Sequence, residues 1–271
     1  MSASQQILLV GFGNMGQALV RGWLAHGRAA SGIEVVDPAS AARAVATKLG
    51  VAAHEDAAAA AARADVVVLA VKPNQLAHVL PKCAPAAARG AVFLSIAAGK
   101  TIAEIGASLG LTAAVVRGMP NTPAAIGKGM TALVANAAVS SAQRALCSDL
   151  LAAVGAVAWL DDERDMDAVT AISGSGPAYV FLLIECFEQA ATELGLDASL
   201  AKQLALTTVA GAGEYAAAAG ESPAELRRRV TSPNGTTQAA LEVLMAQPGL
   251  RELLARATRA AAQRSRELAE A

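Results

Sequence analysis

A glycine-rich turn near the start of the chain has the residue types and spacing that hold a dinucleotide. Gly11 to Gly16 reads GFGNMG; it follows the apolar run ILLV and precedes a helical stretch, and Asp37 ends the next apolar run. In this G-x-G-x-x-G pattern, Gly11 permits a tight turn, Gly13 lets the backbone approach a pyrophosphate, and Gly16 lets the helix pack on the strand. The N–H groups at the helix start then face the anion. The pattern predicts a dinucleotide site, with a turn that binds nothing as the alternative.

Three further loops carry small and polar residues where apolar runs end: AVKPNQ at 70–75, SIAAG at 95–99 and RGMPNTPA at 117–124. Open α/β sheets bind ligands beyond the carboxyl ends of their strands. Lys72 and Pro73 are therefore expected at the edge of the cofactor, and the small residues of SIAAG leave room for a flat ring. Asn121 carries an amide suited to a carboxamide or to a substrate. The residues assigned to cofactor binding are Gly11, Phe12, Gly13, Asn14, Met15, Gly16, Asp37, Ala70, Val71, Lys72, Pro73, Ala97 and Asn121.

Two polar segments interrupt the second half of the chain. SGSGPAY at 173–179 opens a long apolar helix, with Pro177 in its first turn, and SPNGTTQAAL at 232–241 opens another. A helix start rich in free N–H groups and hydroxyls can seat the carboxylate of a small acid. Plain N-caps are the alternative interpretation. The residues assigned to substrate binding are Ser175, Ser232, Gly235, Thr236 and Thr237.

The second half lacks a group for alcohol chemistry. Oxidation of an alcohol needs a side chain that takes the hydroxyl proton. The residues after GSGP read AYVFLLIECF, without a lysine; Lys202 has no glycine motif before it, and His26, His54 and His78 all lie in the first third. This argues against a hydroxyacid or ketoacid dehydrogenase on the same scaffold. The spacing of the histidines and cysteines also predicts no metal site.

The order of the apolar runs predicts the elements that position these loops. Up to about residue 160, short β-rich runs alternate with helical stretches; the runs are 6–10, 33–37, 65–71, 91–98, 113–119, 130–136 and 156–160. This indicates an α/β fold, a Rossmann-type doubly wound, mostly parallel sheet, whose last strands, joined by fewer helices, are free to run differently. The remaining sequence has helical periodicity. We therefore expect a dinucleotide-binding domain at 1–163 and an all-helical dimerisation and substrate domain at 164–271.

Composition excludes several classes of partner. The 271 residues carry a formal net charge of -1, and the basic run RRR at 227–229 is too short for a nucleic-acid surface. No apolar run was found to approach the ~18–20 residues of a membrane span. The first residues show no basic leader region, and Cys83, Cys147 and Cys186 form no C-x-x-C, so a cytoplasmic protein with buried free thiols is expected. The helix AYVFLLIECF is apolar on almost every side, which predicts that a second copy of the chain covers it.

Taken together and in this order, GFGNMGQAL, AVKP, SIAAG, RGMPNTPA, SGSGPAY and SPNGTT resemble the pyrroline-5-carboxylate reductase family over the whole chain. The resemblance implies NAD(P)H-dependent reduction of 1-pyrroline-5-carboxylate to L-proline in proline biosynthesis. It also implies a homo-oligomer, a dimer or a larger ring of dimers such as a decamer. The substrate carboxylate would sit on the N–H groups of Thr236 and Thr237 and on the Thr237 hydroxyl, which would also lie near the ring nitrogen as the catalytic group. A non-catalytic dinucleotide sensor is a further alternative.

Two positions depart from the family pattern. Asn234 stands where SPGGTT has a glycine, and asparagine tolerates the left-handed backbone region that such a turn requires. Asp37 stands where members that prefer NADPH carry small polar residues. A carboxylate there suits a ribose 2′-OH and repels a 2′-phosphate, which Arg43 could offset; alternatively Asp37 caps the helix near Pro38. The choice between NADPH and NADH stays open.

Overall fold

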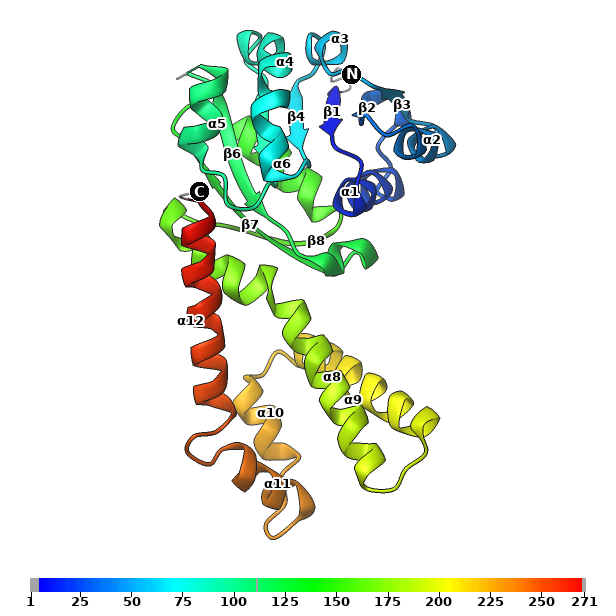
Figure 1. The fold of residues 1–271 in the computed structure, drawn as a ribbon, viewed down its shortest axis with the longest axis vertical. Coiled ribbons are helices and arrows are strands. Elements are labelled where there is room, and N and C mark those ends of the chain that lie inside the picture. The colour runs from blue at the N-terminus through cyan, green and yellow to red at the C-terminus, as the bar shows by residue number, and fades with distance from the viewer. Residues whose placement is uncertain (1–4, 111, 270–271) are drawn as a thin grey trace. The chain divides into compact units, whose positions relative to one another are not determined.

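The computed structural model describes residues 5–110 and 112–269, and the chain forms two compact units (Figure 1). One unit runs to Gly174 and includes the residues from Ala262 onward; the other is Ser175–Ala261. The expected domain boundary at 163/164 lies before this division, and helix α12 (Leu250–Ala269) contributes to both units. The outer ends of the expected domains, residues 1–4 and 270–271, lie outside the described residues.

The first unit is built on an eight-stranded sheet with the order β3-β2-β1-β4-β5-β6-β7-β8. Neighbouring strands are parallel except for β6 and β7, which are antiparallel, so the last strands do run differently. Each of the seven expected runs overlaps a strand. The strands are β1 (Ile7–Val10), β2 (Ile33–Val36), β3 (Ala52–His54), β4 (Val66–Leu69), β5 (Val92–Ser95), β6 (Ala114–Met119), β7 (Gly129–Ala135) and β8 (Gly155–Trp159).

Helices cover both faces of this sheet because its strands are apolar on both sides; every residue of β1 and of β4 is buried. The core on one face includes Leu19 and Trp23 of α1, and Trp23 Nε1 donates to the Leu150 carbonyl of α6 at 2.7 Å. The core on the other face includes Phe93 and Ile105. The helices of this unit are α1 (Asn14–Ala25), α2 (Ser40–Lys48), α3 (Ala58–Ala61), α4 (Leu76–Ala88), α5 (Ile102–Leu109), α6 (Ser141–Ala152) and α7 (Met166–Val169). A π-helical turn, Thr170–Gly174, ends the unit.

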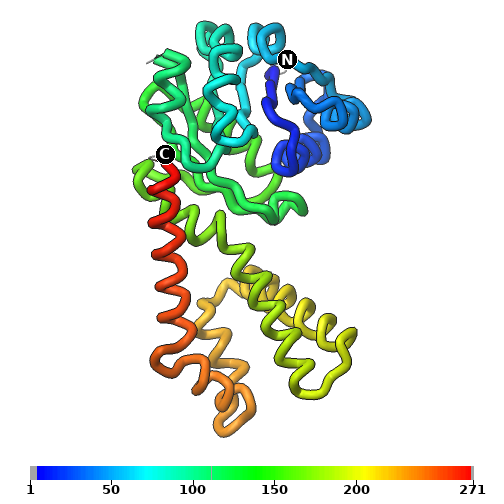
Figure 2. The backbone as a smooth tube through the Cα atoms, in the orientation of Figure 1, coloured from blue at the N-terminus to red at the C-terminus, as the bar shows by residue number. Residues whose placement is uncertain are grey.

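The second unit is helical, as expected for this part of the chain. Its long hairpin is formed by α8 (Gly176–Glu193) and α9 (Ala198–Ala219), which pack side by side and can be followed along the tube in Figure 2. The Asp197 side chain accepts from the N–H groups of Ser199 and Leu200 and so starts α9. Helices α10 (Pro223–Arg229) and α11 (Thr236–Leu244) follow, and then the first part of α12.

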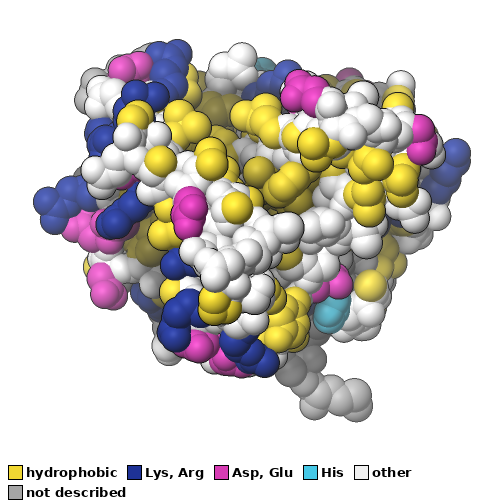
Figure 3. All heavy atoms as spheres, turned by 90° about the horizontal axis from the view of Figure 1, so that it is seen from below, with side chains coloured by type: hydrophobic (Ala, Val, Ile, Leu, Met, Phe, Trp, Pro, Cys, Tyr) yellow, Lys and Arg dark blue, Asp and Glu magenta, His cyan; other side chains and the backbone are white. Residues whose placement is uncertain are grey.

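Helix α8 leaves its apolar side chains uncovered in the single chain. None of its residues, all within the described part of the chain, is buried, and Phe181 and Leu182 are 56% and 59% exposed. Further large hydrophobic residues are exposed on α9, α11 and α12, and Figure 3 shows hydrophobic side chains among charged ones on the face seen from below. This helical unit therefore has apolar surface that the chain itself does not bury.

Two sequence expectations need correction at this helix. Residues 163–193 form one helical stretch that is long and apolar enough, by length and composition alone, to cross a membrane. The prediction that no apolar run approaches the length of a membrane span was therefore wrong. In the sequence the Gly-Ser-Gly-Pro segment divides this stretch; in the structure the segment lies where the π-helical turn ends and α8 begins, with Ser175 as the N-cap residue. Cys186 is exposed on α8, whereas Cys83 and Cys147 are buried as expected, and burial raises the pKa of each of these two thiols to about 12.

Candidate active site

The first and third glycines of the loop after β1 have no room for a side chain. Gly11 has φ +97°, and a Cβ there would lie 2.6 Å from the Ala70 carbonyl oxygen; at Gly16 it would collide with the Gly11 carbonyl oxygen. Around Gly13, in contrast, no described atom lies within 4 Å of the position of a Cβ. The loop is therefore packed where it must turn and open at its second glycine, which is the arrangement that a pyrophosphate needs.

The start of α1 offers free donors beside this open position. Gly13 is the N-cap residue, and no side chain of the described residues caps the helix there. The N–H groups of a first helical turn have no acceptor within the helix, and the helix dipole makes this end attractive to an anion. The Phe12 side chain is buried. The backbone N–H of Phe12 donates to Asp37 and its carbonyl accepts from Gln17, so Phe12 stabilises the conformation of the loop.

Asp37 ties the end of β2 to the glycine loop. Its Oδ2 accepts from the Phe12 N–H at 2.7 Å and its Oδ1 accepts from the Ala39 N–H at 2.9 Å. The helix α2 itself begins after Ala39, so Asp37 is not its N-cap residue. Arg43 Nη1 donates to the carbonyls of Asp37 and Pro38 at 2.9 and 2.7 Å, which holds this turn together. The carboxylate thus lies at the loop where a ribose would be recognised, with both oxygens already accepting from the backbone.

The loops after β4, β5 and β6 lie at the same edge of the sheet, because these strands are neighbours and parallel. Ala70 and Val71 adjoin Gly11, and the exposed Lys72 precedes the short helical turn η2 (Pro73–Gln75). Ala97 is buried, and its N–H lies 3.4 Å from Ser95 Oγ. The structure therefore brings the glycine loop, AVKP and SIAAG together, as the sequence predicts.

Asn121 uses its amide within the protein. Its Oδ1 accepts from the Met130 N–H at 2.9 Å, and its Nδ2 lies 3.2 Å from the Ser173 carbonyl and 3.3 Å from Ser173 Oγ. These contacts join the end of β6 to the π-helical turn. A role of Asn121 toward a bound carboxamide stays a prediction.

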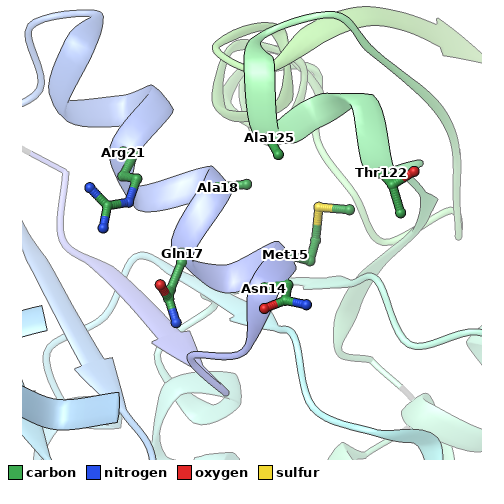
Figure 4. Close-up of a pocket in the computed structure, with 7 residues that line it drawn as sticks. All are labelled: Asn14, Met15, Gln17, Ala18, Arg21, Thr122 and Ala125. Atoms are coloured by element: carbon green, nitrogen blue, oxygen red, sulfur yellow. The ribbon is translucent and has the colours of Figure 1, made fainter. Parts of the chain in front are cut away.

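An open pocket of about 390 Å³ lies beside the glycine loop, between α1 and the turn η3 (Thr122–Ile126). Figure 4 shows Met15 and Ala18 of α1 on the side that faces Thr122 and Ala125. Asn14, Gln17 and Arg21 complete its lining. Of these residues the sequence assigned Asn14 and Met15 to the cofactor. Gln17, Ala18 and Thr122 lie in the quoted motifs but received no role, and Arg21 and Ala125 lie outside the motifs and are brought to the pocket by packing.

In the helical unit, the start of α11 has the shape that SPNGTT predicts. Asn234 takes φ 58°, the left-handed conformation for which asparagine is suited, and a Cβ at Gly235 would collide with Ser232 Oγ. Gly235 is the N-cap residue, and among the described residues no side chain caps α11. Within the same part of the chain, the hydroxyls of Thr236 and Thr237 make no hydrogen bond; Thr236 is exposed and Thr237 half-buried. These hydroxyls are therefore free for another acceptor or donor.

Ser175 and Lys202 both lie in the long helical hairpin. Ser175 is the N-cap residue of α8, and its side chain makes no capping bond to the described residues. Lys202 is exposed on α9. Among residues 5–110 and 112–269, no group of three or more His, Cys, Asp or Glu side chains could hold a metal ion.

A doubly wound sheet with a glycine loop that is open at its second glycine defines a Rossmann-type, dinucleotide-binding protein. Comparison with known proteins narrows this class. Residues 6–99 match the family model "NADP oxidoreductase coenzyme F420-dependent", and residues 163–268 match "Pyrroline-5-carboxylate reductase dimerisation".

Relatives along the whole chain agree with these matches. A pyrroline-5-carboxylate reductase of Pseudomonas aeruginosa is 47% identical over 269 residues, covering 99% of this chain and 98% of that protein. The structure of a pyrroline-5-carboxylate reductase from Coxiella burnetii has a TM-score of 0.94 at 38% identity, with 98% of each chain covered. A Plasmodium falciparum pyrroline carboxylate reductase, solved with NADP bound, has a TM-score of 0.85 at 28% identity, again with 98% of each chain covered. The chain belongs to the pyrroline-5-carboxylate reductase family, which confirms the resemblance.

Proposed function

We propose that this protein reduces 1-pyrroline-5-carboxylate to L-proline with NAD(P)H. One observation carries the proposal: the same chain combines a glycine loop that is open at Gly13 with a helix start at Thr236 and Thr237 whose hydroxyls are not used as caps. The first feature fits a pyrophosphate and the second fits a small carboxylate. The full-length likeness to reductases of this substrate supports the combination.

The reaction places few demands on acid–base groups. When bound, the reduced nicotinamide supplies a hydride to the imine carbon. A protonated imine already carries the positive charge that a carbonyl must acquire, and its nitrogen keeps that proton in the product. The chain therefore has to hold the substrate ring in the right place, which is catalysis by orientation. This explains why a site without histidine suffices, whereas alcohol oxidation would need a proton acceptor.

The substrate is held, in this proposal, by the start of α11. The N–H groups of Thr236 and Thr237 and the Thr237 hydroxyl bind the carboxylate, and the Thr237 hydroxyl also lies near the ring nitrogen. Ser232 and Gly235 shape that turn. Ser175, whose side chain caps nothing among the described residues, is the further substrate-binding candidate.

NADPH and NADH are both proposed as cofactors. The bound NADP of the Plasmodium falciparum protein supports NADPH. Asp37 supports NADH, because its carboxylate lies at the loop where a 2′-phosphate would approach. Arg43 is engaged with two carbonyls and lies 3.3 Å from Glu55, so it offsets this charge less than a free arginine would.

The helical domain supports self-association, since residues 163–268 match the family's dimerisation domain. We propose that the apolar residues of α8 and α9 meet a second copy, that dimers assemble further into a ring such as a decamer, and that the protein is cytoplasmic and binds neither membrane nor nucleic acid. The apolar stretch at 163–193 then serves the dimer instead of a bilayer.

We expect sedimentation at micromolar concentration to show no folded monomer. Burial of Phe181 and its neighbours between two copies provides the stabilisation that one helical unit lacks. Phe181→Asp should dissociate or unfold the protein, because it places a charge in that apolar contact. A stable, folded monomer of the unchanged protein would contradict this assembly.

The experiment that tests the function is cofactor oxidation, followed by absorbance, with pyrroline-5-carboxylate and with a panel of ketoacids, each with NADPH and with NADH. Turnover restricted to the cyclic imine is expected. Turnover of a ketoacid alone would favour the hydroxyacid dehydrogenase alternative, for which the comparisons offer no support. Cofactor binding without any turnover would favour the sensor.

A further inference from the structure

A partly buried ion pair lies beside the loop that follows β5. Arg117 of β6 is 6% exposed, and its Nη1 donates to Glu163 Oε1 at 2.9 Å. The same carboxylate oxygen accepts from the Ile102 N–H, also at 2.9 Å. Glu163 thus joins the neighbouring strand to the first residue of α5. The sequence patterns assign no role to either side chain, although Arg117 is the first residue of the RGMPNTPA segment.

The contacts of Glu163 act on both ends of the segment 96–101. At one end, Arg117 is the register partner of Ser95, the last residue of β5. At the other end, Ile102 opens α5, and its N–H has no acceptor within the helix. Thr101 and Glu104 satisfy other free donors of this helix start through a capping box, so Glu163 supplies the acceptor that the box does not.

Packing from the end of the chain limits this loop further. A Cβ at Gly99 would lie 3.4 Å from the Leu268 carbonyl oxygen of α12. The Ser265 hydroxyl of the same helix donates to Asp167 Oδ1 at 2.6 Å and is itself buried. Leu268 thus lies close to the loop at Gly99, while Glu163 holds the start of α5 at Ile102.

We propose that Glu163, held by Arg117, is a positioning residue. It keeps the loop that carries Ala97 in the position, relative to the nicotinamide ring, that hydride transfer requires. The inference rests on the proposed function and on the prediction that the small residues of SIAAG leave room for the flat ring of the cofactor. Glu163 acts through the Ile102 N–H and makes no contact with substrate or cofactor in this proposal. A loop displaced by a fraction of an ångström would still admit the ring but would hold it wrongly.

The experiment compares Glu163→Ala with Glu163→Gln in the full-length protein. Glu163→Ala should lower kcat by about tenfold to a hundredfold, because misplacement of reacting groups has effects of that order. The dissociation constant for NADPH, measured by fluorescence without substrate, should barely change, because the glycine loop is untouched. Glu163→Gln should restore most of kcat, since its amide oxygen can still accept from Ile102 and Arg117.

The neighbouring pair supplies the control. Arg164 pairs with Asp162, and its side chain is 90% exposed, so Arg164→Ala should leave kcat and KM unchanged. If Glu163→Ala does not fold, Glu163→Asp replaces it; this variant keeps the charge but shortens the reach, and its kcat should fall below that of Glu163→Gln.

The outcomes separate the two proposals. Glu163→Ala with a lowered Tm and the kcat of the unchanged protein would show a merely structural role and overturn the positioning role, and so would a Glu163→Asp as active as Glu163→Gln. A Glu163→Ala variant that lost affinity for NADPH but kept its kcat would also overturn the positioning role. Failure of the unchanged protein to turn over pyrroline-5-carboxylate would instead overturn the proposed function.

Discussion

Glutamate in place of Gly13 is expected to abolish dinucleotide binding and to leave the fold intact. The backbone of Gly13 has φ -73°, which any residue adopts, and no described atom lies within 4 Å of a Cβ there, so the side chain fits the free protein. It would then occupy the space of the pyrophosphate and bring a like charge to it. Fluorescence titration with NADPH and NADH measures the binding, and circular dichroism measures the fold.

Gly106→Glu is the matched control. Gly106 lies in α5. As at Gly13, no described atom lies within 4 Å of the position that a Cβ would take there. The same charge is added there without touching the loop, so cofactor affinity should be retained. If Gly13→Glu bound either dinucleotide with unchanged affinity, the cofactor site would have to be placed elsewhere.

Removal of the Thr237 hydroxyl is expected to cut kcat/KM by about one to two powers of ten. The proposed charge-assisted hydrogen bond to the substrate is worth roughly 1.5–3 kcal/mol, which corresponds to a loss of that order. Cofactor affinity should barely change, because the glycine loop belongs to the other unit. Thr237→Ser keeps the hydroxyl and should keep most activity. Steady-state kinetics and Tm are measured on both variants.

The capping interpretation of Thr237 makes the opposite forecast. If the hydroxyl stabilised its helix, alanine would lower Tm and leave the kinetics near normal. The structure favours an unchanged Tm, because Gly235 is the N-cap and no cap bond from a side chain is present among the described residues. Thr258→Ala serves as the control: this half-buried helical threonine of the same unit donates its hydroxyl to the Leu254 carbonyl, so its loss should affect stability alone.

Local signals in the sequence were sufficient to predict the glycine loop and every strand of the described sheet except β3. Buried parallel strands read as continuous apolar runs, and each glycine has a distinct steric requirement, which Gly11, Gly13 and Gly16 meet in the structure. Strand β3 escaped prediction because Ala52–His54 is alanine-rich, a composition that favours helix, and pairs only with β2 at the sheet edge. Asn234 adopts the left-handed turn that its residue type permits.

Features that depend on contacts between distant segments could not be predicted. Glu163 and Arg117 are 46 residues apart and become partners only when β6 lies beside the start of the helical stretch. The division after Gly174 coincides with the end of the π-helical turn, which the sequence pattern does not distinguish from ordinary helix. Cys186 was expected to be buried as a free thiol of a reducing compartment, but it lies on α8, none of whose residues is buried within the described single chain.

Transfer of deuterium to proline tests the central claim most directly. The protein would be incubated with pyrroline-5-carboxylate and with NADPH or NADH that is dideuterated at carbon 4 of the nicotinamide, and the product examined by mass spectrometry. We expect proline that carries one deuterium per oxidised cofactor, on the ring carbon next to nitrogen that does not bear the carboxylate. Oxidised cofactor without labelled proline, or deuterium recovered in a hydroxyacid formed from a ketoacid, would contradict the assignment.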